Sequence, residues 1–146
     1  MNYVIIGAGP AGVVAAETLR KNDPDGDITM ISGEGTSPYS RMAIPYFLTG
    51  KIEESGTHLR KTDGHYDASG IKIIAENVNK VDPGSSTITL ASGDTVSYDK
   101  LLIASGATPV KPPVPGLDNK GVHHCWTLED AHNIVKHAAK GSDVVL

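Results

Sequence analysis

The sequence predicts a three-layer α/β fold that combines a parallel β-sheet with an antiparallel three-stranded β-meander. Three observations lead to this prediction. An apolar N-terminal segment runs into a glycine-rich turn, further strand-sized apolar segments follow helical or irregular stretches, and polar and apolar residues alternate between residues 78 and 98. The first two patterns are typical of a parallel sheet covered by helices, whereas the alternation is typical of antiparallel strands.

The N-terminal segment is predicted to form a strand, a tight turn and the start of a helix. Residues 2–6 are mainly apolar, Gly-x-Gly-x-x-Gly follows at residues 7–12, and an alanine-rich segment continues to residue 21. A glycine pattern between a strand and a helix is typical of dinucleotide-binding folds, because it brings a pyrophosphate to the helix N-terminus. The sequence therefore predicts a dinucleotide site; the alternative is a glycine turn that serves packing alone.

Each glycine of this turn has a separate expected role. Gly7 allows a turn that a Cβ atom would obstruct, Gly9 lets the backbone approach a pyrophosphate, and Gly12 lets the helix lie close to the strand. Pro10 suits the start of the helix, where its missing N–H costs little. The N–H groups of the helix start and the positive end of its dipole then attract an anion without a charged side chain.

A second strand is expected at residues 27–31, and an acidic residue follows it. Glu34 lies 22 residues after Gly12. Dinucleotide folds place an acid that accepts hydrogen bonds from the adenosine ribose at ~20 residues beyond the glycines. Glu34 is therefore predicted as the ribose ligand; the alternative is an exposed loop carboxylate.

An irregular, half-apolar segment at residues 36–50 contains the only Phe and two of the five Tyr. Loops rarely collect aromatic residues unless these pack against something flat or buried. Arg41 lies in this segment, where its planar guanidinium is suited to a bidentate contact with a pyrophosphate. The alternative is an ion pair with a surface carboxylate such as Glu53.

The middle of the chain is expected to contain the remaining strands. A short helix at residues 60–69 leads to a strand at residues 71–75, and the meander follows at residues 78–98. Residues 101–104 are continuously apolar, which predicts a strand buried on both faces. Ser105 and Gly106 follow at its carboxyl end, where open α/β sheets place ligands.

The proline-rich stretch at residues 108–116 contains four of the nine prolines and is expected to be a stiff, extended connector. It predicts a domain boundary. Residues 1–110 are assigned to the first, incomplete segment of a nucleotide-binding domain. Residues 111–146 are assigned to the linker, a helix and the first strand of a second domain.

The C-terminal helix is predicted from a capping box at Thr127 and Asp130, where Asp replaces the usual Glu or Gln. Gly141 is expected to stop this helix, and residues 142–146 are expected to begin a buried strand. The positions predicted to face inward are Leu128, Ala131, Val135 and Ala138.

The composition argues against several classes of protein. Lys and Arg number 13 against 17 Asp and Glu, for a net charge of −4, so a nucleic-acid partner is not expected. The apolar runs are too short to span a bilayer, and no signal-peptide pattern precedes the glycine turn, so no membrane association is expected. The single cysteine, Cys125, excludes an internal disulfide, and a cytoplasmic location is expected.

No catalytic acid, base or nucleophile is predicted, and no metal site. His123, His124 and Cys125 are adjacent, but three consecutive side chains without a fourth ligand at suitable spacing match no zinc pattern. Packing or surface roles are the expected alternative for all three.

Four features in one order resemble the FAD-dependent pyridine nucleotide-disulfide oxidoreductase superfamily. They are the glycine turn at residues 7–12, Pro-Tyr-Ser-Arg at residues 38–41, the strand and Ala-Ser-Gly corner at residues 98–106, and the segment at residues 121–131. The resemblance covers essentially the whole chain. It is strongest to the branch without a redox disulfide, which includes ferredoxin and rubredoxin reductases and the flavin part of nitrite reductases. The resemblance implies an FAD/NAD(P)-binding Rossmann-like fold.

The resemblance also implies which residues hold FAD. The glycine turn would bind the pyrophosphate of FAD, and the acid after the second strand would bind its ribose. The arginine would approach the flavin side of the cofactor, and the main chain at the start of the meander would contact the adenine. The residues so assigned are Gly7, Gly9, Pro10, Ala11, Gly12, Glu34, Arg41 and Val78, together with Ala104, Ser105 and Gly106 at the end of the fourth parallel strand.

Departures from the family pattern indicate which branches of the family the chain resembles less. Ferredoxin reductases often have a lysine soon after the arginine, near the position that Tyr46 occupies here. No Cys-x-x-x-x-Cys motif is present, which excludes dithiol exchange, and the cysteine that NADH oxidases and peroxidases carry near residues 42–43 is absent.

The implied function is an oxidoreductase that passes electrons from NAD(P)H through FAD to a protein or small-molecule acceptor, with a homodimer as one compatible assembly. The resemblance implies that residues 1–110 are the first, incomplete segment of the FAD-binding domain and that residues 111–146 begin a truncated NAD(P)-binding domain. Family members continue with a second glycine pattern for NAD(P)H, so we expect the 146 residues to be a fragment that is inactive alone. Two alternatives remain open. One is a non-catalytic module that binds FAD or NAD, and the other is half of an NAD-dependent dehydrogenase, which the antiparallel meander disfavours.

Overall fold

The computed structural model describes residues 1–145 and divides into two compact units. The first unit consists of Met1–Ser40 and His58–Gly106. The second consists of Arg41–Thr57 and the residues from Ala107 onward. Each unit is described separately below.

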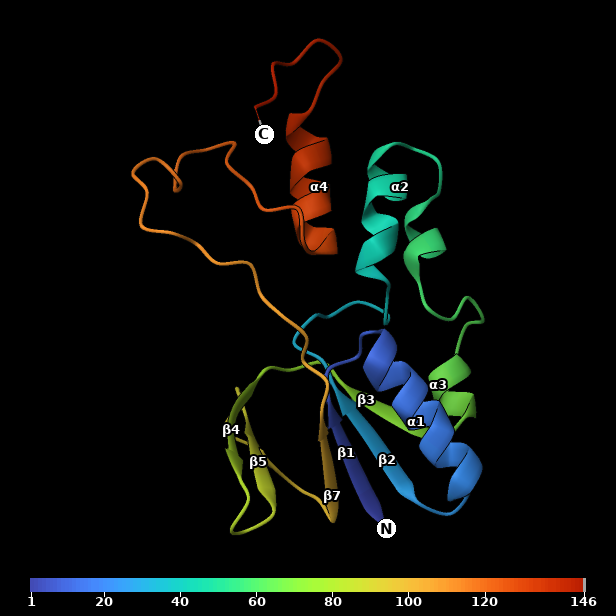
Figure 1. Cartoon of the computed structure of the whole chain (residues 1–146). Helices are drawn as coiled ribbons and strands as arrows, with labels where there is room; N and C mark the ends of the chain where they lie inside the picture. Colours follow the sequence, from blue (N-terminus) through green and yellow to red (C-terminus); the bar gives the residue numbers. More distant parts are fainter. Residues whose placement is uncertain (146) are drawn as a thin grey trace. The chain divides into compact units, whose positions relative to one another are not determined.

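A four-stranded parallel sheet forms the centre of the first unit (Figure 1). Its strands are β1 (Asn2–Ile6), β2 (Asp27–Ile31), β3 (Ile71–Ile74) and β7 (Lys100–Ile103), in the order β3-β2-β1-β7. All three strand pairs are parallel. The carboxyl ends of the four strands therefore meet at one edge of the sheet, the position where open α/β sheets bind ligands.

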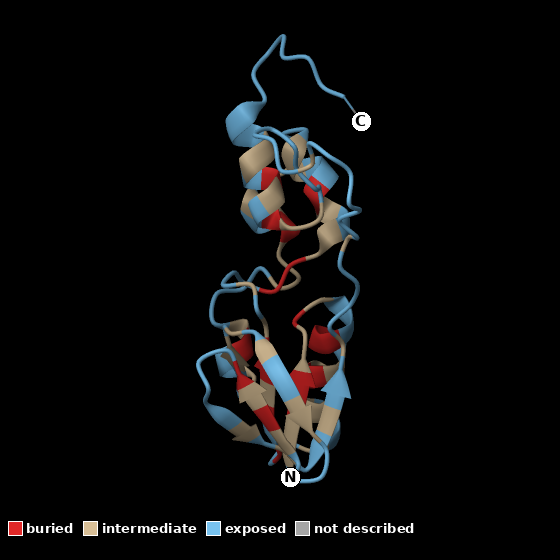
Figure 2. Ribbon diagram, turned by 90° about the vertical axis from the view of Figure 1, so that its left-hand side faces the viewer, coloured by how far each residue is buried: buried red, intermediate tan, exposed pale blue. Residues whose placement is uncertain are grey.

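Two helices, α1 (Pro10–Asn22) and α3 (His65–Ala68), cover one face of this sheet. The first is the helix predicted after the glycine turn, whereas the second is much shorter than the predicted helix at residues 60–69. Buried residues of the helices and the sheet form one hydrophobic cluster between them, and Figure 2 colours the buried parts of the ribbon red. The cluster consists of Ile5, Val13, Ala16, Ile28, Met30, Tyr66 and Ile71.

An antiparallel sheet covers the other face. It contains β4 (Val78–Asp82), β5 (Thr87–Leu90) and β6 (Thr95–Ser97), in that order. Because side chains alternate along a strand, Val4 of β1 points to this second layer. It packs there with Ile31, Ile88 and Leu90. The predicted three-layer fold, with a parallel sheet and a three-stranded meander, is confirmed.

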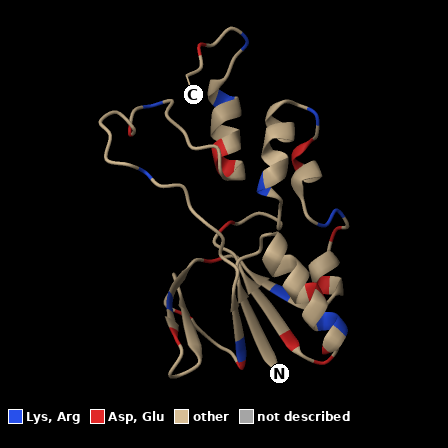
Figure 3. Cartoon of the chain, in the orientation of Figure 1, with Lys and Arg blue, Asp and Glu red and all other residues tan. Residues whose placement is uncertain are grey.

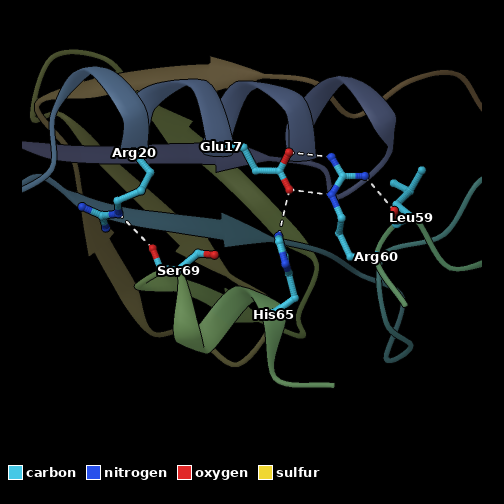
Figure 4. Close-up of polar contacts among 6 residues, drawn as sticks. All are labelled: Glu17, Arg20, Leu59, Arg60, His65 and Ser69. Atoms are coloured by element: carbon cyan, nitrogen blue, oxygen red, sulfur yellow. Dashed lines mark hydrogen bonds and ion pairs between the residues drawn. The ribbon is translucent and has the colours of Figure 1, made fainter. Parts of the chain in front are cut away.

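Polar side chains of α1 tie this helix to the segment around α3 (Figure 4). The carboxylate of Glu17 accepts hydrogen bonds from Arg60 Nε at 2.7 Å and Nη2 at 2.5 Å, and lies 2.9 Å from His65 Nε2. One turn later, Arg20 Nε donates to the carbonyl of Ser69 at 2.9 Å. A helix as short as α3 is not stable by itself. The two contacts stabilise it by holding its segment against the longer helix α1.

The second unit contains two 3₁₀ turns, η1 (Arg41–Ala43) and η2 (Glu54–Thr57), and two helices, α2 (Ile44–Leu48) and α4 (Leu128–His137). Its helices pack on each other, and the ring of Phe47 meets that of His132 edge-on at 5.8 Å. The buried residues of this unit are Ile44, Thr57, Leu128 and Ala131.

The predicted capping box starts α4. The Thr127 hydroxyl accepts from the Asp130 N–H at 3.1 Å, and the Asp130 carboxylate accepts from the N–H groups of Thr127 at 2.9 Å and Trp126 at 3.0 Å. Burial alone would raise the pKa of Asp130, but these backbone hydrogen bonds outweigh burial and hold the pKa below its usual value. Asp therefore replaces Glu in the box without loss of the reciprocal hydrogen bonds.

Two expectations about burial are wrong. The strand β7 is not buried on both faces, since Leu102 is 41% and Ile103 63% exposed. Among the described residues β7 pairs only with β1, so it lies at the edge of the sheet. In α4, Val135 is 51% exposed, whereas the neighbouring Ile134 is half-buried. Ala138, another position expected to face inward, is the C-cap residue and is exposed.

The helix α4 ends at His137, before Gly141. Residues 142–145 form no strand within the described part of the chain, and Val144 and Val145 are exposed. A strand is defined by hydrogen bonds to a neighbour, and no described residues supply one here. Leu146 lies outside the described residues. Among the helices of residues 1–145, none has both the length and the apolar character that a membrane span requires.

Candidate functional site

The glycine turn and the Ala-Ser-Gly corner lie side by side at the carboxyl edge of the parallel sheet. The Gly7 N–H donates to the Ile31 carbonyl at 2.8 Å, and the Ala104 N–H donates to the Ile6 carbonyl at 2.8 Å. A Cβ atom at Gly7 would overlap the carbonyl oxygen of Ala104 and stand 3.0 Å from the nitrogen of Ser105. Gly7 has a φ of +111°, which only glycine adopts readily. Glycine at this position therefore allows the turn after β1 and the segment after β7 to come into contact.

The other two glycines of the turn have contrasting surroundings. A Cβ atom at Gly12 would overlap the carbonyl oxygen of Gly7, so glycine is needed for close packing of α1 on β1. A Cβ atom at Gly9 would have no heavy atom of the described residues within 4 Å outside its chain neighbours. Gly9 has an extended backbone, with φ −75° and ψ −176°, that any residue adopts. Packing therefore explains Gly7 and Gly12 but does not explain Gly9.

The start of α1 keeps its anion-binding capacity. Its first helical hydrogen bond runs from the Val13 N–H to the Gly9 carbonyl at 3.0 Å, and no side chain of the described residues caps the helix. No charged residue precedes Glu17 in the sequence. Figure 3 shows Lys and Arg interspersed with Asp and Glu elsewhere along the chain. The helix dipole at the turn is thus not neutralised by a nearby carboxylate of the first turn.

The loop after β2 is held by backbone and side-chain contacts. The Ser32 N–H donates to the Ile74 carbonyl at 2.9 Å, and the Glu34 N–H donates to the Ser32 hydroxyl at 3.4 Å. A Cβ atom at Gly33 would overlap the amide oxygen of Asn77. The backbone that carries Glu34 is therefore placed next to the segment that opens the meander.

The side chain of Glu34 has a partner in Tyr39, whose hydroxyl donates to the Oε2 atom of Glu34. Tyr39 is 6% exposed. The sequence alone did not identify Tyr39 or Asn77 as site residues. The unusual collection of aromatic residues in this loop was the available signal for Tyr39, whereas Asn77 is brought to Gly33 only by the fold.

Val78 begins β4 and pairs with Leu90. Its side chain packs against the buried cluster between the two sheets, which leaves its main chain as the part suited to a ligand contact. The ladder shifts register between Val78 and Lys80. The main-chain contact to adenine stays a prediction.

Arg41 and Trp126 contact each other within the second unit. The Cζ atom of Arg41 lies 4.8 Å from the centre of the Trp126 ring, and the indole N–H donates to the carbonyl of Ala107 at 3.1 Å. Stacking of this kind is typical of arginine, whose planar cation is attracted to an aromatic face. The approach of Arg41 to the flavin side of a cofactor stays a prediction, as do the roles of Ser105 and Gly106, which are exposed.

Residues 1–145 contain no group of three His, Cys, Asp or Glu side chains arranged to hold a metal ion. Cys125 is an exposed free thiol. The ring of His123 lies 5.2 Å from that of His137, and neither belongs to a larger cluster of potential ligands in the described part of the chain.

Comparison with known proteins identifies the family. Residues 1–146 match the pyridine nucleotide-disulphide oxidoreductase family. The chain belongs to this family. The match confirms the resemblance found in the four sequence motifs, and it covers both units of the structure.

Three members of the family illustrate the likeness. The chain is 36% identical to a probable ferredoxin reductase, CtmF, of Castellaniella defragrans, over 98% of this chain and 35% of the relative. It is 32% identical to the rubredoxin-NAD(+) reductase of Pseudomonas putida, over 100% of this chain and 38% of the relative. The crystal structure of NADH:rubredoxin oxidoreductase from Clostridium acetobutylicum superposes with a TM-score of 0.80 and 33% identity, over 92% of this chain and 35% of that one. The chain thus spans about a third of the length of these relatives.

Proposed function

We propose that the chain is the FAD-binding portion of an NAD(P)H-dependent flavoprotein oxidoreductase, which passes electrons from NAD(P)H through FAD to a protein or small-molecule acceptor. The single observation that carries the proposal is the contact between Gly7 and Ala104. It brings the glycine turn and the Ala-Ser-Gly corner together at the ligand-binding edge of a parallel sheet.

The residues present fit a bound dinucleotide. Gly9 is the one glycine of the turn whose missing side chain leaves open space around its Cβ position, and a pyrophosphate is a group that would use that space. The uncapped start of α1 supplies N–H groups and a positive dipole to the same place. In the proposed complex, this turn binds the pyrophosphate and Glu34 accepts hydrogen bonds from the adenosine ribose.

When bound, FAD supplies the redox chemistry by accepting a hydride from NAD(P)H and releasing its electrons to the acceptor. The residues of this chain bind and orient the cofactor in the proposed complex. The main chain of Val78 contacts the adenine, Arg41 lies at the flavin side, and Ser105 and Gly106 limit the flavin end. No side chain of the described residues is assigned a proton-transfer step.

The nature of the acceptor is proposed from the relatives. Two of them are named as reductases of ferredoxin or rubredoxin, which are proteins. A protein acceptor is therefore the first candidate, and a small molecule is the second. The cytoplasmic location expected from the sequence belongs to the same proposal.

Gly9→Val tests the cofactor site directly. Gly9 has an extended backbone and open surroundings but is the N-cap residue of α1, so valine is expected to lower the melting temperature only slightly, through the loss of a preferred N-cap residue. The same side chain would occupy the space assigned to the pyrophosphate, so FAD affinity should fall by about a hundredfold or more, the equivalent of two lost charge-assisted hydrogen bonds. FAD binding is measured by quenching of flavin fluorescence.

Ser97→Val is the control, because it places the same side chain at an exposed position of β6, outside both the glycine turn and the loop after β2. This variant should bind FAD as the wild type does. If Gly9→Val binds FAD with wild-type affinity, the proposed pyrophosphate site is wrong.

The two alternative functions are separated by ligand and by turnover. A ligand that binds only the folded state raises the melting temperature. A rise with NAD but not with FAD would favour a dehydrogenase half and oppose the proposal. FAD binding without electron transfer in the protein that contains the remaining family domains would favour a non-catalytic module.

A further inference from the structure

We propose that Tyr39 is a positioning residue, which holds the carboxylate of Glu34 in the orientation that receives the adenosine ribose. This inference rests on the proposed function, because it assigns a role within the FAD site. The observation behind it is the hydrogen bond that the Tyr39 hydroxyl donates to Glu34 Oε2.

The need for such a residue follows from the position of Glu34. It lies in the loop after β2, outside any helix or strand, and is only half-buried. A glutamate side chain in a loop has many rotamers, and fixing it on ligand binding costs conformational entropy. A hydrogen bond that already fixes the carboxylate in the free protein reduces this cost, which is the general advantage of preorganisation.

Tyr39 is itself held rigidly within the first unit. Its side chain is 6% exposed, and its backbone forms an isolated antiparallel bridge with His58. The neighbouring Leu59 N–H donates to the carbonyl of Pro38 at 2.9 Å. Contacts to a distant part of the chain therefore fix the tyrosine, and the tyrosine in turn fixes the glutamate.

The chemistry of the pair suits ribose recognition. An ionised carboxylate is an acceptor only, with about four lone-pair sites on its two oxygens. A phenol hydroxyl donates to one site and orients both oxygens. The vicinal hydroxyls of a ribose are donors in a fixed geometry, so the orientation of the carboxylate decides how well they are matched.

A purely structural role for Tyr39 predicts different behaviour. If the tyrosine only anchors the loop, its ring is sufficient, so Tyr39→Phe should leave ribose recognition intact. If Tyr39→Phe disrupts the loop, the affinities for nucleotides with and without ribose hydroxyls should fall equally. A positioning role predicts a loss that depends on the ribose hydroxyls themselves.

The test compares ADP with 2′,3′-dideoxy-ADP by isothermal titration calorimetry, on the full chain, in wild type and Tyr39→Phe. ADP carries the adenosine and pyrophosphate part of FAD. We expect Tyr39→Phe to weaken ADP binding about three- to tenfold, the effect of one misplaced charge-assisted hydrogen bond. Binding of dideoxy-ADP should not change. FAD affinity should fall by the same factor as ADP affinity.

Tyr3→Phe is the matched control. The Tyr3 hydroxyl donates to the Asp23 carboxylate at 3.0 Å, so this variant removes another tyrosine–carboxylate hydrogen bond of the same unit without touching the loop after β2. It should bind both nucleotides as the wild type does. Glu34→Gln is the second site variant. It should lose the preference for ADP over dideoxy-ADP, and adding Tyr39→Phe to it should cause no further loss.

The outcomes separate this inference from the proposed function. Equal affinities of wild type and Tyr39→Phe for ADP, or an equal loss for ADP and dideoxy-ADP, would overturn the role of Tyr39 alone. If Tyr39→Phe fails to fold, a Glu34→Gln variant that keeps the wild-type preference for ADP over dideoxy-ADP overturns it as well. A wild-type protein that binds neither FAD nor ADP would overturn the proposed function and, with it, this inference.

Discussion

Glu17 and Arg60, which are 43 residues apart in the chain, form a two-point ion pair at 2.7 and 2.5 Å. The hydrogen bond from Arg60 lowers the pKa of Glu17 below 4.5 despite the opposing effect of burial, and His65 adds to the lowering. A carboxyl group whose pKa is lowered by folding stabilises the protein above its unfolded pKa. This contribution is lost as the pH falls through the folded pKa.

Glu17→Gln is therefore expected to lower the free energy of unfolding by about 1 kcal/mol at pH 7, a value limited by the partial exposure of the pair. The difference from the wild type should shrink as the pH falls below 4.5. Urea unfolding followed by circular dichroism at several pH values measures it. Glu53→Gln, at an exposed position, is the control and should change little at any pH. A Glu17→Gln deficit that is independent of pH would contradict the role of the charge.

Gly7→Ala should be strongly destabilising. The new methyl group would overlap the Ala104 carbonyl oxygen, and the φ of +111° is unfavourable for alanine. Together these effects are expected to lower the free energy of unfolding by more than about 2 kcal/mol.

Gly93→Ala separates the two effects. Gly93 has a φ of +95° but open space around its Cβ position. Alanine there should lower the free energy of unfolding only through the unfavourable backbone conformation, by about 1 kcal/mol. Chemical denaturation measures both variants. If Gly7→Ala and Gly93→Ala lower the free energy of unfolding equally, the close approach of Gly7 to Ala104 is not present in solution.

Tyr66→Phe should leave stability unchanged or raise it by up to about 1 kcal/mol. The Tyr66 hydroxyl is buried without a hydrogen-bond partner among the described residues, and burial raises the pKa of Tyr66. A buried polar group without a partner is destabilising, so its removal relieves a cost while the ring keeps its packing.

Tyr3→Phe provides the comparison in thermal unfolding. Its hydroxyl has the Asp23 carboxylate as partner, so this variant should lower the melting temperature. A lower melting temperature for Tyr66→Phe would mean that a partner, such as a bound water, satisfies its hydroxyl in solution.

The elements that the sequence predicts well are those determined by local chemistry. The strand, turn and helix at residues 2–22 follow from the apolar segment and the glycines, and the capping box of Thr127 and Asp130 is a local signal as well. The alternation at residues 78–98 likewise reports the antiparallel strands directly. In each case the residues that form the element also carry the pattern.

The expectations that are wrong depend on neighbours distant in sequence. The apolar strand β7 has the composition of a buried strand, but its exposure is decided by whether a further strand or helix lies beside it. The contact between Tyr39 and Glu34 depends on how an irregular loop folds back, and the position of Asn77 against Gly33 depends on the meander. No periodicity encodes such contacts.

The bridge between Tyr39 and His58 has a consequence for how this fold can vary. The chain departs from the first unit after Ser40 and returns at His58, two points that this bridge holds together. The stretch between them therefore begins and ends at nearly the same place. A change in its length would not displace the strands of the sheet. Each doubling of such an excursion costs only about 0.6 kcal/mol in closure entropy. Insertions at the exposed residues 49–51 of this stretch should therefore be tolerated while the parallel sheet stays unchanged.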